Sequence, residues 1–174
     1  GQPGDTEVLE KYLNKFTKPA TLYYEGCSMT AIWGVRSLGI DPATGQEMFL
    51  TKDGRSTYTW SSADQVVIGD TSPKMSGTLN LNAGYKGFTF SASCSYKFGG
   101  DLYNSELVAR MENINGQSNL DRRLFNAWQK VGDVAPYKVT VISSGSTNYT
   151  KPTSRFVQKN NELYISSVNV GYDF

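Results

Sequence analysis

The chain has 174 residues, enough for one domain with a sizeable core or for part of a larger protein. Its 17 basic and 16 acidic side chains give a formal charge of +1, and no run of Lys and Arg predicts a nucleic-acid-binding face. Histidine is absent, so the commonest general base and the commonest zinc ligand are missing, and the composition argues against a hydrolase. The 11 Tyr residues and many Ser, Thr, Asn and Gly favour strands joined by turns.

The N-terminal stretch, residues 5–16, is predicted to form a helix. Asp5 or Thr6 can cap it, and its apolar residues recur at helical spacing: Val8, Leu9, Tyr12, Leu13 and Phe16. Pro19 cannot continue the hydrogen-bond ladder and marks the end of this helical lead-in.

From residue 31 onward the sequence predicts short strands with tight turns. Strands are expected over residues 32–39, 47–51 and 56–60, because Pro, Gly and Asp-Gly turn signals separate them. The turns that contain Asp41 and Asp53 have too few oxygen ligands to predict calcium loops.

The clearest pattern is the strict alternation over residues 78–98, which predicts a long hairpin turning at residues 86–87. Apolar side chains fall on one face of this hairpin and Ser, Thr and Asn on the other. The final segment, residues 164–174, alternates in the same way.

The apolar face of these strands fits either of two surroundings. In a soluble protein it would pack on a core, whereas aromatic residues at both ends of a run of about eleven residues suit a tilted strand in a bilayer. The residues expected to face lipid in that case are Phe88, Phe90, Ala92, Tyr96, Phe98, Val168, Val170 and Tyr172. Periodicity alone does not choose between the two.

Residues 99–156 predict a long loop region with short helices over residues 105–112 and 119–130. No apolar run reaches the roughly 20 residues that a membrane-spanning helix needs. Cys27 and Cys94 lack metal-ligand spacing and are either two free thiols or one disulfide. No metal ligands, cofactor site or catalytic residues are predicted.

Several residues are candidates for ligand contacts. The aromatic residues Trp60, Tyr103, Trp128 and Tyr137 could stack on a flat ligand or serve as core aromatics. Asp121 and Arg122 could hydrogen-bond a polar ligand or a partner, or simply begin a helix. An Asp121–Asp133 carboxylate pair is a third option, but adjacent Arg residues favour ordinary ion pairs, so an enzyme is not predicted.

Five stretches of the sequence, in order, resemble characteristic segments of the SusC/RagA-type TonB-linked outer-membrane proteins. They cover nearly the whole chain: residues 31–50, residues 69–74 with the hairpin turn at 85–88, residues 96–100, residues 119–133 and residues 153–156. Each phrase is weak alone, and their common order makes the resemblance strong.

The resemblance implies a mainly β fold, an antiparallel meander of about six or seven strands taken from a 22-stranded barrel. It implies one segment, 1–174, with a helical lead-in (5–16), strands and hairpins (31–98), a long extracellular loop (99–156) and a final strand (157–174). The implied location is the bacterial outer membrane.

The resemblance also implies partners: the rest of the barrel and its plug, a SusD-like lipoprotein lid, TonB through an N-terminal part missing here, and an oligosaccharide or peptide substrate. We therefore expect this chain to contribute strands and an extracellular loop to a nutrient importer, without being transport-competent alone. An isolated chain is expected to self-associate through its apolar faces and unpaired edges. The alternative is a free-standing, soluble β-rich carbohydrate-binding module.

Overall fold

The computed structural model describes residues 8, 17–114, 119, 121–139 and 149–173. The chain divides into two compact units: unit 1 comprises Gly1–Gly69 and Tyr103–Val157, and unit 2 comprises Asp70–Leu102 and Gln158–Phe174. The helix expected over residues 5–16 lies outside the described residues, apart from Val8.

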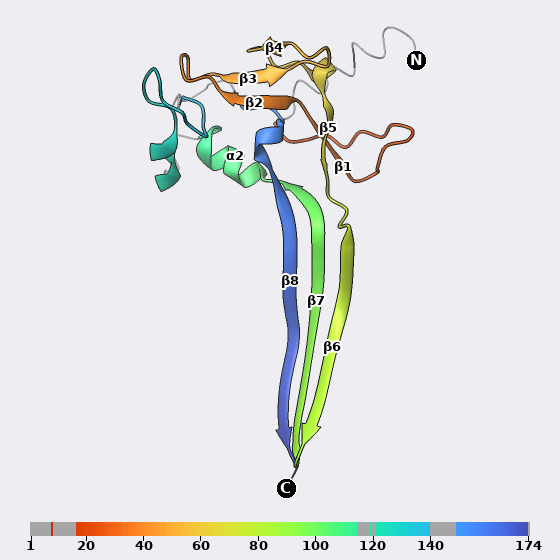
Figure 1. The fold of residues 1–174 in the computed structure, drawn as a ribbon. Helices are drawn as coiled ribbons and strands as arrows, with labels where there is room; N and C mark the ends of the chain where they lie inside the picture. Colours follow the sequence, from red (N-terminus) through yellow and green to blue (C-terminus); the bar gives the residue numbers. More distant parts are fainter. Residues whose placement is uncertain (1–7, 9–16, 115–118, 120, 140–148, 174) are drawn as a thin grey trace. The chain divides into compact units, whose positions relative to one another are not determined.

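Unit 1 contains two small sheets. Strands β2 (Arg36–Ile40), β3 (Glu47–Leu50) and β4 (Ser56–Thr57) form an antiparallel meander, and β1 (Ala31–Gly34) pairs with β5 (Val66–Asp70) (Figure 1). The single strand expected over residues 32–39 is divided at Val35. Its backbone leaves for a parallel bridge to Thr153, in which Val35 N–H donates to the Pro152 carbonyl at 3.1 Å.

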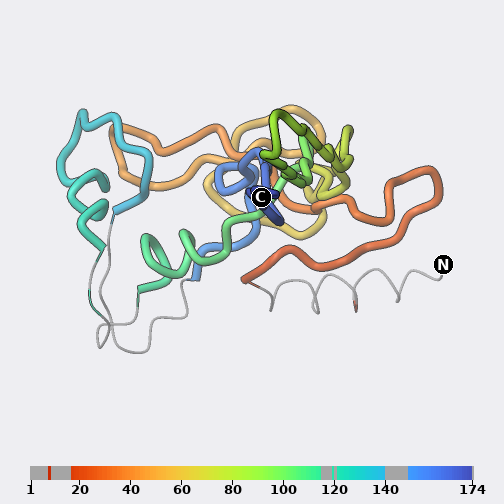
Figure 2. Tube along the Cα trace, turned by 90° about the horizontal axis from the view of Figure 1, so that it is seen from below, coloured from red at the N-terminus to blue at the C-terminus, as the bar shows by residue number. Residues whose placement is uncertain are grey.

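The core of unit 1 lies between a helix and a distant turn. Helix α2 (Ser105–Met111) begins after Asn104, whose side chain accepts a hydrogen bond from Leu107 N–H at 2.8 Å. Its apolar face packs against the 3₁₀ turn η3 (Ser154–Phe156), and the two lie side by side in Figure 2. The buried cluster consists of Leu107, Val108, Met111 and Phe156.

The prediction of a helix over residues 119–130 is wrong. The structure has only a short 3₁₀ turn there, η2 (Arg122–Asn126), and another short turn, η1 (Ser62–Asp64), between β4 and β5. The helical ladder cannot continue past η2, since Trp128 N–H donates to the Tyr137 carbonyl at 3.1 Å.

Unit 2 is one antiparallel sheet of three long strands, in the order β6-β7-β8 (Figure 1). The strands are β6 (Met75–Tyr85), β7 (Phe88–Tyr103) and β8 (Val157–Tyr172), and the end residues Tyr103 and Val157 belong to unit 1. Lys86 and Gly87 form the two-residue turn between β6 and β7 with φ of 47° and 86°. Positive φ at both central residues matches the twist of a hairpin. The mainly β, antiparallel fold predicted from the sequence is confirmed. The hairpin strands β6 and β7 are longer than expected, whereas β4 has only two residues of the strand expected over residues 56–60.

Candidate functional surface and the placement of the predicted site residues

The unit 2 sheet separates apolar and polar side chains onto opposite faces. β6 and β7 pair without interruption from Met75 opposite Phe98 to Tyr85 opposite Phe88. Because directly opposed residues share a face, the alternating patterns of the two strands coincide. The apolar face of this hairpin carries Met75, Leu79, Leu81, Ala83 and Tyr85 from β6 and Phe88, Phe90, Ala92, Cys94, Tyr96 and Phe98 from β7.

Strand β8 continues both faces. The Phe88 and Tyr172 rings lie 4.6 Å apart between centroids, and Ser166 Oγ donates to the Ser93 carbonyl at 2.9 Å. This register places Tyr164, Val168, Val170 and Tyr172 with the apolar face of β7. The residues predicted to face lipid therefore lie on one surface.

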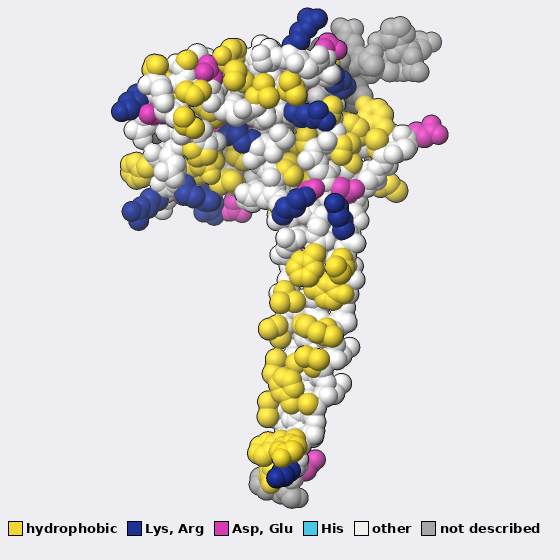
Figure 3. All heavy atoms as spheres, in the orientation of Figure 1, with side chains coloured by type: hydrophobic (Ala, Val, Ile, Leu, Met, Phe, Trp, Pro, Cys, Tyr) yellow, Lys and Arg dark blue, Asp and Glu magenta, His cyan; other side chains and the backbone are white. Residues whose placement is uncertain are grey.

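No described residue of unit 2 covers this apolar face. Most of its side chains are exposed, and only those in the middle of the central strand β7, such as Ala92 and Tyr96, are half-buried. In Figure 3 hydrophobic side chains form a continuous stripe along the long strands (Figure 3). An exposed apolar surface of this length is typical of a site that contacts lipid or another protein.

Aromatic residues gather at the two ends of the apolar face. Near the hairpin turn, Phe88 contacts Tyr172, and the Lys86 ammonium lies 5.4 Å from the centre of the Tyr85 ring. At the other end, the rings of Tyr96 and Phe98 stack with centroids 5.7 Å apart. Smaller side chains, Ala92 and Cys94, occupy the middle of β7.

The opposite face carries short, uncharged polar side chains over most of its length. They bond across the strands: Ser93 Oγ lies 2.6 Å from Asn80 Oδ1, and Asn169 Nδ2 donates to Ser91 Oγ at 3.4 Å. Hydroxyl and amide groups of this kind can exchange hydrogen bonds with water or a polar solute.

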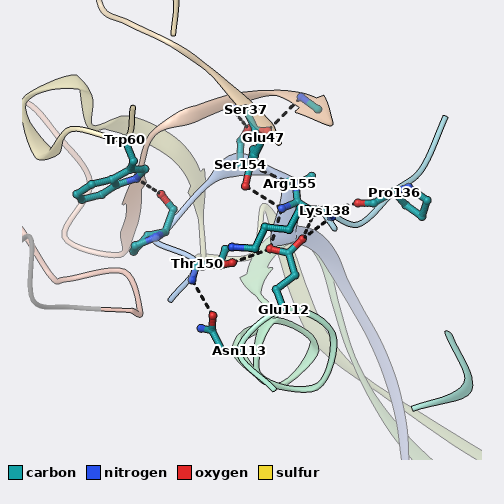
Figure 4. A network of polar contacts seen from close by, with 12 residues as sticks. Ser37, Glu47, Trp60, Glu112, Asn113, Pro136, Lys138, Thr150, Ser154 and Arg155 are labelled. Carbon is teal, nitrogen blue, oxygen red and sulfur yellow. Dashed lines mark hydrogen bonds and ion pairs between the residues drawn. The ribbon is translucent and has the colours of Figure 1, made fainter. Parts of the chain in front are cut away.

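In unit 1, a buried ion network centres on Arg155 (Figure 4). Its guanidinium donates to both carboxylate oxygens of Glu47, at 3.1 and 2.8 Å, and pairs with Glu112 at 2.7 Å. Arg155 also donates to the Pro136 carbonyl, and Glu112 accepts from Thr150 Oγ1 at 2.7 Å. The network therefore joins β3, α2, η3 and two loop segments.

The charges of this network support one another. Burial alone raises the pKa of the Glu112 carboxyl, but hydrogen bonds and the charge of Arg155 outweigh it, so the pKa lies below its ordinary value. Burial opposes the charged form of Arg155 as well, yet Glu47 and Glu112 raise its pKa. Burial lowers the pKa of Lys138 despite the two nearby carboxylates.

The two tryptophans predicted to contact a ligand, Trp60 and Trp128, form hydrogen bonds with backbone carbonyls of unit 1. Trp60 Nε1 donates to the Pro152 carbonyl at 3.2 Å, and Trp128 Nε1 donates to the Pro42 carbonyl at 2.9 Å. The Trp128 ring lies over Gly45, where an added Cβ would come within 2.5 Å of it. Both side chains are half-buried, so these contacts secure loops.

The remaining residues predicted to contact a ligand, Tyr103, Asp121 and Arg122, differ in their exposure and in their contacts. Tyr103 packs on the buried cluster with its ring 6.4 Å from that of Phe156. Asp121 caps η2 and pairs with Arg123 at 2.7 Å, which lowers the pKa of its carboxyl to about 2. Arg122 is exposed and makes no ion pair with another described residue.

The structure does not assemble these residues into one site. Within the described part of the chain, no hydrogen bond, ion pair or ring contact joins Trp60, Tyr103 and Trp128. Their role as ligand or lid contacts stays a prediction, as does the lipid-facing role of the unit 2 residues.

Over the same described residues, no cluster of His, Cys, Asp and Glu suited to a metal ion occurs. Cys27 and Cys94 are free thiols. No described helix has the length and apolar character needed to cross a membrane.

Known proteins resemble the chain in sequence and in fold. TonB-dependent receptors P3 and P39 of Formosa agariphila are each 26% identical to it, over 140 and 112 residues, or 80% and 64% of the chain. Solved structures of the RagAB peptide transporter, in the open-open and closed-closed states among others, match 82% of the chain with TM-scores of 0.58 to 0.60 at 19–21% identity. No family model matches.

The resemblance to SusC/RagA-type TonB-dependent receptors, predicted from the sequence, is confirmed by these similarities. At this level of identity the solved structures establish the fold. These relatives are receptors and transporters rather than enzymes, which agrees at family level with the absence of a predicted catalytic site.

The chain spans a small part of these SusC/RagA-type relatives. It corresponds to 13% and 11% of the two receptors and to 16% of the transporter chains. Transport by such a receptor is therefore a property of a protein several times longer than the residues described here.

The sequence did not single out Arg155 or its partners. Glu47, Glu112 and Arg155 are far apart in the chain, and isolated charges in a mixed sequence give no signal of burial. The packing of Trp128 on the Asp41–Gly45 turn also gives no sequence signal, because Trp128 and Pro42 are 86 residues apart in the chain.

Proposed function

We propose that the chain supplies three membrane-spanning strands and an extracellular loop region to an outer-membrane TonB-dependent importer. In this proposal the apolar face of β6, β7 and β8 contacts lipid and the polar face lines a wet lumen. Residues 99–156 belong to the extracellular side.

The exposed, continuous apolar face is the observation that carries the proposal. β6 has 11 residues. At about 3.4 Å per residue and a tilt of about 40–45°, a strand of that length crosses about 25 Å, the height of the apolar band of outer-membrane barrels. Aromatic residues at both ends, including Tyr85 and Phe98, are typical of the membrane interfaces.

The importer's cargo and partners are part of the proposal. We propose an oligosaccharide or a peptide as substrate, with a plug, a SusD-like lipoprotein lid and TonB as partners of the full-length receptor. The names of the relatives support import in general, since RagAB is a peptide transporter.

Two neighbouring substitutions in the full-length receptor test the membrane assignment. Leu81→Arg places a charge on the apolar face opposite Ala92, while Asn82→Arg places the same charge on the polar face opposite Ser91. A cation near the bilayer midplane destabilises a barrel by about 2–4 kcal/mol, so Leu81→Arg should sharply reduce folded receptor in the outer membrane. Asn82→Arg should leave most of it folded.

Heat-modified migration on gels measures the folded fraction of each variant. Equal losses for the two variants, or a greater loss for Asn82→Arg, would contradict the lipid-facing assignment. That result would mean that the apolar face of β6, β7 and β8 packs against protein rather than lipid.

A further inference from the structure

The turn between β6 and β7 carries a lysine at a position whose backbone favours asparagine or glycine. Lys86 has φ of 47°, and no other described residue except glycine has a positive φ. A side chain in this left-handed region strains the backbone, and Asn or Gly is usual at the first central position of such a turn. The needs of the turn therefore do not explain the lysine.

The turn is fixed against the end of β8. Asp173 N–H donates to the Gly87 carbonyl at 2.8 Å, and a Cβ added at Gly87 would lie 3.1 Å from a ring carbon of Tyr172. The Phe88 and Tyr172 rings beside it lie 4.6 Å apart between centroids. The backbone of Lys86 is thus held in place by the packed end of the sheet.

Three aromatic side chains lie side by side across the sheet at this end. Tyr85 is directly opposite Phe88 in the β6–β7 register, and Phe88 contacts Tyr172 on β8. The Lys86 ammonium lies 5.4 Å from the centre of the Tyr85 ring, which places its charge on the apolar face of the sheet. Figure 3 likewise shows a basic side chain among hydrophobic ones at the hairpin end of the stripe.

The charge of Lys86 has no counter-charge within the described part of the chain. None of the ion pairs formed there includes Lys86, and its side chain is exposed. A lysine at the edge of a bilayer keeps its ammonium at the level of the headgroups, where lipid phosphates supply negative charge. An ammonium beside three rings therefore suits a ligand with an anionic head and an apolar body.

We propose that Lys86 and the three aromatic rings beside it bind an anionic glycerophospholipid, with the lipid phosphate on the ammonium and the glycerol and upper acyl chains on the rings. The site rests on the proposed function, because it requires the apolar face to contact lipid. It adds a preference for one class of headgroup. Phosphatidylglycerol fits this class, whereas the phosphate of phosphatidylethanolamine is already balanced by the lipid's own ammonium.

Native mass spectrometry of the purified full-length receptor tests the site. Phosphatidylglycerol is added to the receptor in detergent, and the bound lipid molecules are counted for the wild type and each variant. Lys86→Asn removes the ammonium and introduces a residue that suits the turn, so the hairpin is retained. Lys86→Arg keeps the charge. Lys52→Asn is the matched control, because Lys52 is an exposed lysine in a turn of unit 1.

Lys86→Asn should weaken the binding of the first phosphatidylglycerol several-fold. Lys86→Arg and Lys52→Asn should bind this lipid as the wild type does. Phosphatidylethanolamine should bind more weakly than phosphatidylglycerol, with little dependence on Lys86. An excess of inorganic phosphate should not displace the lipid, because the rings hold its apolar part.

Unchanged phosphatidylglycerol binding in Lys86→Asn would overturn the proposal, as would an equal loss in Lys52→Asn. Displacement by inorganic phosphate would overturn it by showing a site for free anions, and Lys86-dependent binding of lipopolysaccharide alone would do so by showing another lipid class. Heat-modified migration of Lys86→Asn should match that of the wild type, since a loss of folded receptor would make Lys86 a structural residue.

The Leu81 and Asn82 comparison separates this site from the membrane assignment. A normal outcome there with a failure here would remove the lipid site and leave the apolar face in contact with the bilayer. A failure there would remove both proposals.

Discussion

Arg155 holds unit 1 together through one side chain. Its guanidinium satisfies two buried carboxylates, those of Glu47 and Glu112, which come from β3 and from the end of α2. The planar fork of arginine donors suits such a double role, which lysine cannot fill in the same geometry. Removing the guanidinium would leave two acids buried without their counter-charge.

We therefore predict that Arg155→Met lowers the free energy of unfolding of unit 1 by about 3–5 kcal/mol, the usual cost of breaking a buried ion pair. All three tryptophans lie in unit 1, so their fluorescence during urea unfolding in detergent reports on it. Adding Glu47→Gln and Glu112→Gln should recover part of the loss, because no uncompensated charge then remains.

Arg110→Met provides the control for this measurement. Arg110 pairs with Glu106 at 2.6 Å on the exposed side of α2, and such surface pairs contribute at most about 0.5 kcal/mol. Unfolding of Arg155→Met at the same urea concentration as Arg110→Met would contradict the structural role of the network.

The role of individual side chains was the part that the sequence predicted least. Trp60 and Trp128 were candidates for stacking on a ligand, yet their indole N–H groups bind carbonyls of Pro152 and Pro42, 92 and 86 residues away in the chain. An aromatic side chain looks the same in a sequence whether it faces a ligand or a loop. Only the long-range fold decides.

At the scale of elements, the alternation of apolar and polar residues predicted the long strands correctly. The hairpin predicted over residues 78–98 is present as β6 and β7, because one face of each strand is apolar and the other polar along its whole length. The prediction of a helix over residues 119–130 was wrong because Trp128 packs on the distant Asp41–Gly45 turn and donates a hydrogen bond to the Pro42 carbonyl. The strand over residues 32–39 is divided for the same kind of reason, since Val35 bridges to Thr153.

The contact between Trp128 and this turn gives a prediction about two loops. Gly45 has φ of +68°, and an added Cβ would lie 2.5 Å from the Trp128 ring. Gly45→Ala should therefore displace the ring and change its fluorescence maximum, besides straining the backbone. Gly54→Ala is the matched control, because Gly54 has φ of +81° with open space around it.

The control substitution should cost about 1 kcal/mol for the left-handed backbone alone. The extra destabilisation of Gly45→Ala in urea unfolding then measures the packing of Trp128. Equal effects of the two substitutions, with unchanged fluorescence, would show that the indole does not hold the turn.

At the scale of the whole molecule, the chain enters unit 2 at Asp70, leaves it after Leu102 and returns at Gln158. Unit 1 has a buried cluster of its own, whereas the described residues of unit 2 form a single sheet without a covering layer. Such a sheet has an apolar face and the outer edges of β6 and β8 available for association.

This difference predicts how the isolated chain behaves in solution. Without detergent, the apolar face of the sheet should drive self-association, seen as early elution in size exclusion and strong binding of an apolar dye. A detergent micelle covers the same face, so the chain should then elute as a single β-rich species by far-UV circular dichroism. If Leu81→Arg weakens the association in buffer while Asn82→Arg does not, the face that associates is the one assigned to lipid. A β-rich monomer in plain buffer that binds no dye would mean that the face finds cover within the chain, and the membrane assignment would then fail.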